Sequence, residues 1–401
     1  MPKLSDRAHK LPESPIRKLV LYAEAAKKRG TKVYHLNIGQ PDIATPPEFF
    51  QAIQDANLKV LAYSHSAGNE SLRKQIAEYY GRLGHQLDVG QINVTTGASE
   101  ALSFVFSSVM NADEQVIVPE PFYANYNSFS LANSASVVPV PTRIEDDFAL
   151  PEMEAFEAKI TDKTRAILIC NPGNPTGILY PRESLEKLRD IVVKHDLFLI
   201  ADEVYREFVY DSLEHHSTLS LGLDDHVVVV DSISKRFSAC GARIGCVISR
   251  NEKLMQSVLK LSQARLAPPT YGQLGAEAVY QLPQTFYENV VSEYRDRRDQ
   301  LKASLDQIEG VHCPNVNGAF YSMVRLPVDC AEKFCQWMLE EFDHNGATVM
   351  MAPGEGFYAT PGSGTNEVRI AYVLNQTDLT AAMECLSAGL KVYPGCTVGS
   401  V

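Results

Sequence analysis

Short apolar runs alternate with amphipathic stretches through the middle of the chain. Arg182–His195 and Glu70–Tyr80 each place apolar residues on one face of a helix. The apolar runs are almost continuous, which is typical of a sheet buried on both faces. This alternation predicts an α/β fold with a mostly parallel sheet that binds ligands at the carboxyl ends of its strands. The predicted strands are Ile92–Thr96, Gln115–Val118, Ser136–Val140, Ala166–Cys170, Phe198–Ala201, Val227–Asp231 and Gly245–Ser249.

The pattern changes near residue 283. A long helical periodicity runs from Pro283 to Ile308, and Gly318–Val324 and Glu367–Val373 have the alternation of strands. The first forty-odd residues carry a helical pattern and then the extended run Val33–Ile38. We therefore predict a large domain over residues 45–283 and a smaller α/β domain formed by residues 1–44 and 284–401.

Composition narrows the class of protein. The chain has 401 residues, of which 45% are hydrophobic and 21% charged, as in ordinary globular proteins. The net charge of -12 argues against nucleic-acid and anionic-membrane partners. No apolar run is long enough to span a bilayer, and the first residues lack the apolar core of a signal peptide. Because Cys170, Cys240 and Cys246 lie in apolar or motif segments, we expect buried free thiols and a cytoplasmic protein.

One lysine follows a predicted strand directly. Lys235 lies in the segment Ser-Ile-Ser-Lys-Arg-Phe-Ser-Ala-Cys-Gly-Ala-Arg-Ile-Gly of residues 232–245. An amine at the end of a buried strand can lose its proton and attack a carbonyl carbon. The hydroxyls of Ser232 and Ser234 and the guanidinium of Arg243 can hold a phosphate beside it. This combination predicts pyridoxal phosphate held as a Schiff base.

Two glycine-containing segments follow other strands. In Gly97-Ala98-Ser99 the backbone N–H groups of Ala98 and Ser99 can bind an anion at a helix N-terminus, although an ordinary turn with a serine cap gives the same pattern. The stretch Asn-Pro-Gly-Asn-Pro-Thr-Gly at residues 171–177 predicts a rigid loop. Its Asn174 can present an amide to a phenolic oxygen.

Two charged side chains have apolar neighbours. Asp202 ends the run Phe198–Ala201, where a carboxylate can keep a pyridine nitrogen protonated or simply cap a helix, and Tyr205 follows one turn later. Arg369 lies in a strand flanked by apolar residues and is costly there unless it is paired. A substrate carboxylate or a structural salt bridge would each satisfy it.

Together these segments resemble the class I/II pyridoxal-phosphate-dependent aminotransferases of fold type I, the aspartate aminotransferase-like group. The motifs N-P-x-N-P-T-G, D-x-x-Y and S-x-S-K with G-x-R-x-G keep the family's order over nearly the whole chain. The resemblance implies a large domain with a mostly parallel seven-stranded sheet between helices, plus a smaller α/β domain. It also implies a homodimer with active sites at the interface.

The resemblance assigns roles to residues of this chain. It implies that the catalytic residues are Lys235, Asp202 and Tyr205. Tyr123 would stack on the cofactor ring, and Tyr63 would reach the phosphate of the neighbouring subunit. The other residues expected to bind the cofactor are Gly97, Ala98, Ser99, Asn174, Ser232, Ser234 and Arg243. Those expected to bind the substrate are Gly39, Asn174 and Arg369.

The chain departs from aspartate-specific members in two places. Tyr123 stands where those enzymes often have tryptophan, and Gly97–Glu100 lacks the lysine that recognises a second carboxylate in some bacterial enzymes. Arg265 lies near the position of an arginine that recognises the substrate side chain in other members, but its spacing to Pro268 differs. A surface or interface salt bridge is the favoured interpretation of Arg265.

The implied reaction is ping-pong transfer of an amino group from an L-amino acid to a 2-oxo acid such as 2-oxoglutarate. Aspartate is the first expected donor, and aromatic and neutral amino acids stay open. A lyase of the same fold that catalyses β-elimination has the same motifs and also stays open. A non-catalytic cofactor-binding regulator is disfavoured by the acidic charge. A nicotinamide dehydrogenase is disfavoured because no G-x-G-x-x-G follows a strand, and a metal enzyme because no H-E-x-x-H is present.

Overall fold

A seven-stranded sheet forms the centre of the molecule in this computed structural model, which describes residues 2–398. The strand order is β2-β8-β7-β6-β5-β3-β4. β8 runs antiparallel to both of its neighbours, and the other neighbouring pairs are parallel. The predicted α/β class and all seven predicted strands are confirmed. The strands are β2 (Ile92–Thr95), β3 (Gln115–Glu120), β4 (Ser136–Pro141), β5 (Thr164–Cys170), β6 (Phe198–Asp202), β7 (Val227–Ser232) and β8 (Gly245–Ile248).

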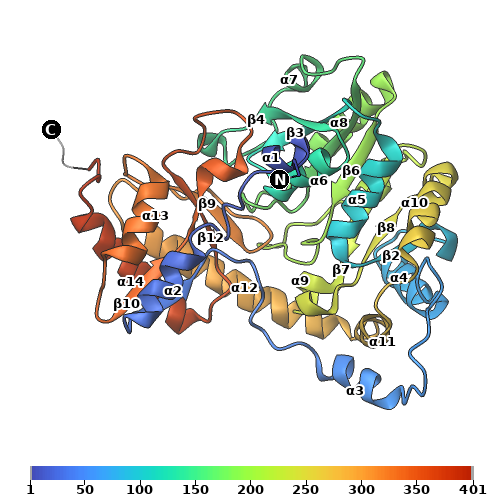
Figure 1. The fold of residues 1–401 in the computed structure, drawn as a ribbon, viewed down its shortest axis with the longest axis horizontal. Helices are drawn as coiled ribbons and strands as arrows, with labels where there is room; N and C mark the ends of the chain where they lie inside the picture. The colour runs from blue at the N-terminus through green and yellow to red at the C-terminus, as the bar shows by residue number, and fades with distance from the viewer. Residues whose placement is uncertain (1, 399–401) are drawn as a thin grey trace.

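Helices cover both faces of this sheet (Figure 1). Leu199 of β6 packs into the cluster on one face, and the next residue, Ile200, packs into the cluster on the other. Both faces of the strand are therefore buried, which explains its continuous apolar run. The first face is covered by α4 (Glu70–Arg82), α8 (Arg182–His195) and α11 (Thr270–Val279), and the second by α5 (Gly97–Val109), α6 (Asn125–Ala132) and α10 (Glu252–Arg265).

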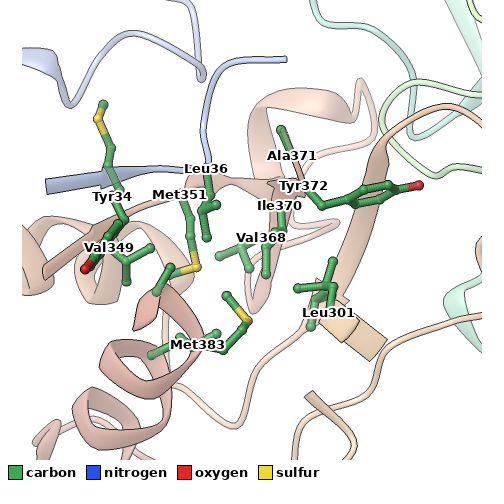
Figure 2. Packing of buried hydrophobic residues seen from close by; sticks show 14 of the residues in the cluster. Tyr34, Leu36, Leu301, Val349, Met351, Val368, Ile370, Ala371, Tyr372 and Met383 are labelled. Carbon is green, nitrogen blue, oxygen red and sulfur yellow. The ribbon is translucent and has the colours of Figure 1, made fainter. Parts of the chain in front are cut away.

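The two ends of the chain share another core. Figure 2 shows Leu36 beside Val349 and Val368, with Met383 from a helix below them. β1 (Lys32–His35) pairs in parallel with β10 (Ala347–Met350), while β11 (Ala352–Pro353), β12 (Glu367–Ala371) and β9 (Tyr321–Arg325) form an antiparallel sheet. The helices of this region are α2 (Val20–Lys28), α13 (Ala331–Glu340) and α14 (Gln376–Val392).

A long helix connects the two cores. α12 (Gln284–Leu305) carries Tyr287 in the core of the large sheet and Leu301 in the core formed by the chain ends. Figure 1 shows it running beneath both parts of the molecule. The domain boundaries at residues 44/45 and 283/284 stay a prediction. The remaining α-helices are short: α1 (Asp6–Lys10), α3 (Pro47–Asp55), α7 (Met153–Glu157) and α9 (Ile233–Arg236).

Several predicted boundaries and one burial prediction differ from the structure. β1 ends at His35, and the next residue, Leu36, bonds through its backbone to Met350 of β10 and Ala371 of β12. Cys246 is buried, but Cys170 and Cys240 are partly exposed because both line cavities, so the burial prediction was wrong for these two. Across residues 2–398, no helix combines the length and apolarity needed to cross a membrane.

Candidate active site

One cavity of about 530 Å³ brings together most of the predicted site residues. It lies where β6 and β7 end, and residues from both chain ends complete its wall. Gly97 lies directly behind this wall, against Arg243. Tyr63 and Arg265 do not line the cavity. The predicted residues that line it are Gly39, Ala98, Ser99, Tyr123, Asn174, Asp202, Tyr205, Ser232, Ser234, Lys235, Arg243 and Arg369.

Lys235 projects from the short helix that follows β7. The hydroxyl oxygen of Ser232 accepts a hydrogen bond from the Ser234 backbone N–H at 3.0 Å and so caps this helix. Lys235 Nζ donates to the Gly39 carbonyl oxygen at 2.8 Å and lies 3.9 Å from Cys240 Sγ. The amine therefore lies between the end of the large sheet and the N-terminal segment.

The start of α5 lines the same cavity as Lys235. Gly97 has φ +75°, which favours glycine, and a Cβ there would lie 2.0 Å from Arg243 Nη2. The Ser232 and Ser234 hydroxyl oxygens are 2.7 Å apart. Helix N–H groups, hydroxyls and a guanidinium converge on one space, which is the donor set that a phosphate monoester needs.

Asp202 ends β6 as a buried carboxylate at the cavity wall. Tyr126 donates its phenolic hydrogen to Asp202 Oδ2 at 2.8 Å, and the Val204 N–H lies 3.4 Å from Oδ1. Burial raises the pKa of Asp202 to about 6, while these two hydrogen bonds act in the opposite direction. A cationic N–H in the cavity would stabilise the ionised carboxylate.

Hydrogen bonds connect four side chains on another side of the cavity: Asn174, Tyr205, Tyr321 and Arg369. Asn174 Nδ2 donates to the Tyr205 hydroxyl at 3.3 Å, and the hydroxyls of Tyr205 and Tyr321 are 3.0 Å apart. Arg369 Nη1 donates to Asn174 Oδ1 at 3.0 Å. Sequence reasoning missed Tyr321, because Gly-Ala-Phe-Tyr at residues 318–321 was interpreted only as a strand.

Arg369 is a buried cation without a carboxylate partner among residues 2–398. Its Nη2 donates to the Asn37 carbonyl oxygen at 2.5 Å, and its Nε has no hydrogen-bond partner. The guanidinium lies over the rings of Tyr321 and Phe357. Burial lowers its pKa. The structural salt bridge considered for this residue is absent from the described chain, so its charge is available to an anion in the cavity.

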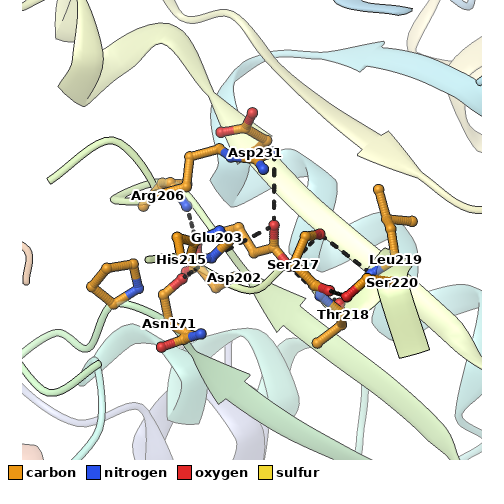
Figure 3. A network of polar contacts seen from close by, with 12 residues as sticks. Asn171, Asp202, Glu203, Arg206, His215, Ser217, Thr218, Leu219, Ser220 and Asp231 are labelled. Carbon is orange, nitrogen blue, oxygen red and sulfur yellow. Dashed lines mark hydrogen bonds and ion pairs between the residues drawn. The ribbon is translucent and has the colours of Figure 1, made fainter. Parts of the chain in front are cut away.

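A polar network fixes the turn that follows Asp202 (Figure 3). Glu203 is buried, and its Oε1 accepts hydrogen bonds from the Ser217 hydroxyl and the Thr218 backbone, each at 3.0 Å. His215 Nε2 lies 3.1 Å from the Asn171 carbonyl oxygen. Burial lowers the pKa of His215, so the imidazole is neutral. These contacts connect the loop after β5 to the turn after β6.

The family model for aminotransferase class I and II matches residues 31–386. The chain belongs to this family. An aspartate aminotransferase of Bacillus subtilis is 30% identical, over 95% of this chain and 97% of its own length. An aromatic-amino-acid aminotransferase of Thermococcus litoralis is 29% identical, over 97% and 98%. The Thermus thermophilus aspartate aminotransferase structure with maleate has 27% identity and a TM-score of 0.88, covering 97% of this chain and 100% of that one.

Family membership makes the protein a pyridoxal-phosphate-dependent aminotransferase, and the cavity fits that cofactor. Ala98 and Ser99 at the start of α5, the hydroxyls of Ser232 and Ser234 and the Arg243 guanidinium line the same cavity, as a phosphate requires. The carboxylate of Asp202 lies at the end of a buried strand, as a pyridinium partner requires. Tyr205 and Asn174 offer hydroxyl and amide donors to a phenolic oxygen.

Besides Gly97, two residues considered in the sequence lie outside the aminotransferase cavity. Tyr63 is 79% exposed, so its role toward a neighbouring subunit stays a prediction. Arg265 Nη1 pairs with Glu100 at 2.9 Å, and its Nη2 donates to the Ser66 carbonyl oxygen at 3.0 Å. The guanidinium of Arg265 is thus held in a salt bridge, which was the favoured interpretation.

Proposed function

We propose that this aminotransferase uses pyridoxal 5'-phosphate to transfer an amino group from an L-amino acid to a 2-oxo acid by a ping-pong mechanism. Aspartate is the first donor to test and 2-oxoglutarate the first acceptor. The observation that carries the proposal is the position of Lys235, Asp202 and Arg369 around one cavity. When bound, the cofactor supplies a protonated ring that withdraws electrons from the substrate α-carbon.

The protein groups then have distinct tasks. Arg369 holds the substrate α-carboxylate with charge-assisted hydrogen bonds, and Asn174 fixes the guanidinium from the side. Asp202 would keep a proton on the ring nitrogen of the bound cofactor. Lys235 Nζ would act as the general base that takes the proton from the substrate α-carbon. Tyr205 would donate a hydrogen bond to the phenolic oxygen.

Replacing Lys235 by alanine tests the proposal. The Lys235→Ala variant should lose the pH-dependent absorbance of the bound cofactor and nearly all turnover, because both depend on the lysine amine. Lys253→Ala removes an exposed lysine from α10 and serves as the control. A Lys235→Ala variant that keeps both the absorbance change and the turnover contradicts the assignment.

Product analysis separates transamination from elimination. For a transaminase, an amino acid added alone to the holoenzyme should give one equivalent of 2-oxo acid per site and no free ammonia. Continuous release of ammonia and pyruvate would instead identify a β-eliminating lyase. Testing the twenty amino acids with 2-oxoglutarate would then define the donor, since the named relatives include both aspartate and aromatic-amino-acid aminotransferases.

We also propose a homodimer in the cytoplasm. Val60, Leu61 and Tyr63, which lie between α3 and α4, are 76%, 60% and 79% exposed. Apolar side chains this exposed favour burial against another chain. Sedimentation of the purified protein as a monomer would contradict the dimer. Tyr63→Phe should weaken binding of the cofactor if the hydroxyl reaches a neighbouring phosphate.

A further inference from the structure

One cationic side chain of the cavity has no role in binding the proposed cofactor or an α-carboxylate. Its lining has one carboxylate, Asp202, and four cationic side chains: Arg17, Lys235, Arg243 and Arg369. Under the proposed function, Lys235 attaches the cofactor, Arg243 faces its phosphate and Arg369 faces the α-carboxylate. No group of the cofactor or of the α-carboxylate is assigned to Arg17.

Arg17 lies on an anchored turn before α2. The Ile16 carbonyl oxygen accepts a hydrogen bond from Asn37 Nδ2 at 2.7 Å, and Leu19 is buried in the core of the chain ends. The next residue, Lys18, forms a salt bridge with Glu332 at 2.5 Å. Arg17 itself is exposed, and its side chain has no hydrogen bond or ion pair within residues 2–398. A fixed backbone therefore presents an unpaired guanidinium at the cavity wall.

Asn37 relates this turn to the proposed α-carboxylate site. Its side chain donates to the Ile16 carbonyl oxygen, and its own carbonyl oxygen accepts from Arg369 Nη2. The residue before Arg17 and the guanidinium of Arg369 are thus held by the same asparagine. Gln40 lines the same cavity, and its side chain likewise has no hydrogen-bond partner in the described chain.

We propose that Arg17 binds the distal carboxylate of a dicarboxylic substrate, such as aspartate, glutamate or their 2-oxo acids. This inference rests on the proposed function, in which Arg369 binds the α-carboxylate of the same molecule. A guanidinium recognises a carboxylate through paired N–H donors. A guanidinium without a partner in the protein breaks no other hydrogen bond or ion pair when it binds one. Arg17 would supply the cation that the segment Gly97–Glu100 lacks, and it would do so from the subunit that carries Lys235.

Equilibrium binding of maleate tests the inference without turnover. Maleate has two carboxylates and no amino group, so calorimetry on the holoenzyme reports recognition alone. Arg17→Gln should weaken maleate binding by about tenfold, the lower end of the range for a charge-assisted hydrogen bond. Arg17→Lys should recover part of the affinity. Lys10→Gln removes one charge from an exposed position of the N-terminal segment outside the cavity and should leave the affinity unchanged.

Substrate pairs give an independent measurement. In Arg17→Gln, kcat/KM for aspartate and glutamate should fall by about tenfold, while that for alanine should change by less than about twofold. Equal losses for aspartate and alanine, or a maleate affinity equal to that of the wild-type protein, overturn the role of Arg17. A wild-type protein that binds maleate with Arg17 dependence but transfers no amino group would instead overturn the proposed function.

Discussion

Asp202 should destabilise the cofactor-free protein as the pH rises. Burial raises its pKa from 3.8 to about 6 in the folded protein. A carboxyl whose pKa is raised by folding contributes stability that is complete below pH 3.8 and is lost as the pH rises through about 6. At 1.36 kcal/mol per pKa unit, this loss amounts to about 3 kcal/mol. Asp202→Asn removes the charge and keeps an oxygen that can accept from Tyr126.

The measurement is urea unfolding of the cofactor-free protein between pH 4 and pH 8 at fixed protein concentration. The free energy of unfolding of Asp202→Asn minus that of the wild-type protein should increase by up to about 3 kcal/mol across this range. Asp225→Asn, which removes an exposed carboxylate, is the matched control. Its difference from wild type should not follow the same profile.

Adding the cofactor should reverse the sign of this difference, so that the wild-type protein becomes more stable than Asp202→Asn. With pyridoxal 5'-phosphate bound, the ring nitrogen becomes the partner of Asp202, so the variant should bind the cofactor more weakly and be less stabilised by it. A difference between variant and wild type that stays flat from pH 4 to pH 8 in the cofactor-free protein would refute the argument, because it would mean that folding does not change the proton affinity of Asp202.

Three further substitutions test the packing of the site. In Gly39→Ala a Cβ would lie 1.7 Å from the Tyr321 hydroxyl oxygen, so kcat/KM should fall about 100-fold in steady-state assays, and an unchanged value would show that the contact relaxes freely. Arg369→Ala should weaken amino-acid binding by more than about 2 kcal/mol, measured as a rise in KM, whereas an unchanged KM would make the residue structural. Arg236→Leu leaves buried Asp231 without its ion-pair partner and should cost about 3–5 kcal/mol in urea unfolding, most of which a second change, Asp231→Leu, should restore.

The residues at the ends of the large-sheet strands could be predicted from the sequence. Lys235 and Asp202 each follow an apolar run within a few residues, so strand position alone places them at one edge of a parallel sheet. Tyr126 was missed although it lies only three residues from Tyr123. Its contact with Asp202 depends on how α6 packs against the sheet, which the pattern of apolar positions does not determine.

The residues that would recognise substrate depend on contacts between distant parts of the chain. Arg369 and Asn174 are 195 residues apart in sequence, and Asn37 joins Arg369 to the turn that carries Arg17. No local pattern encodes these distances, because they follow from the packing of both chain ends against the large sheet. The residues expected to bind the cofactor lie in short sequence motifs. The residues proposed to recognise the substrate are brought together by tertiary packing, so Arg17 could be identified only from its unpaired position in the folded cavity.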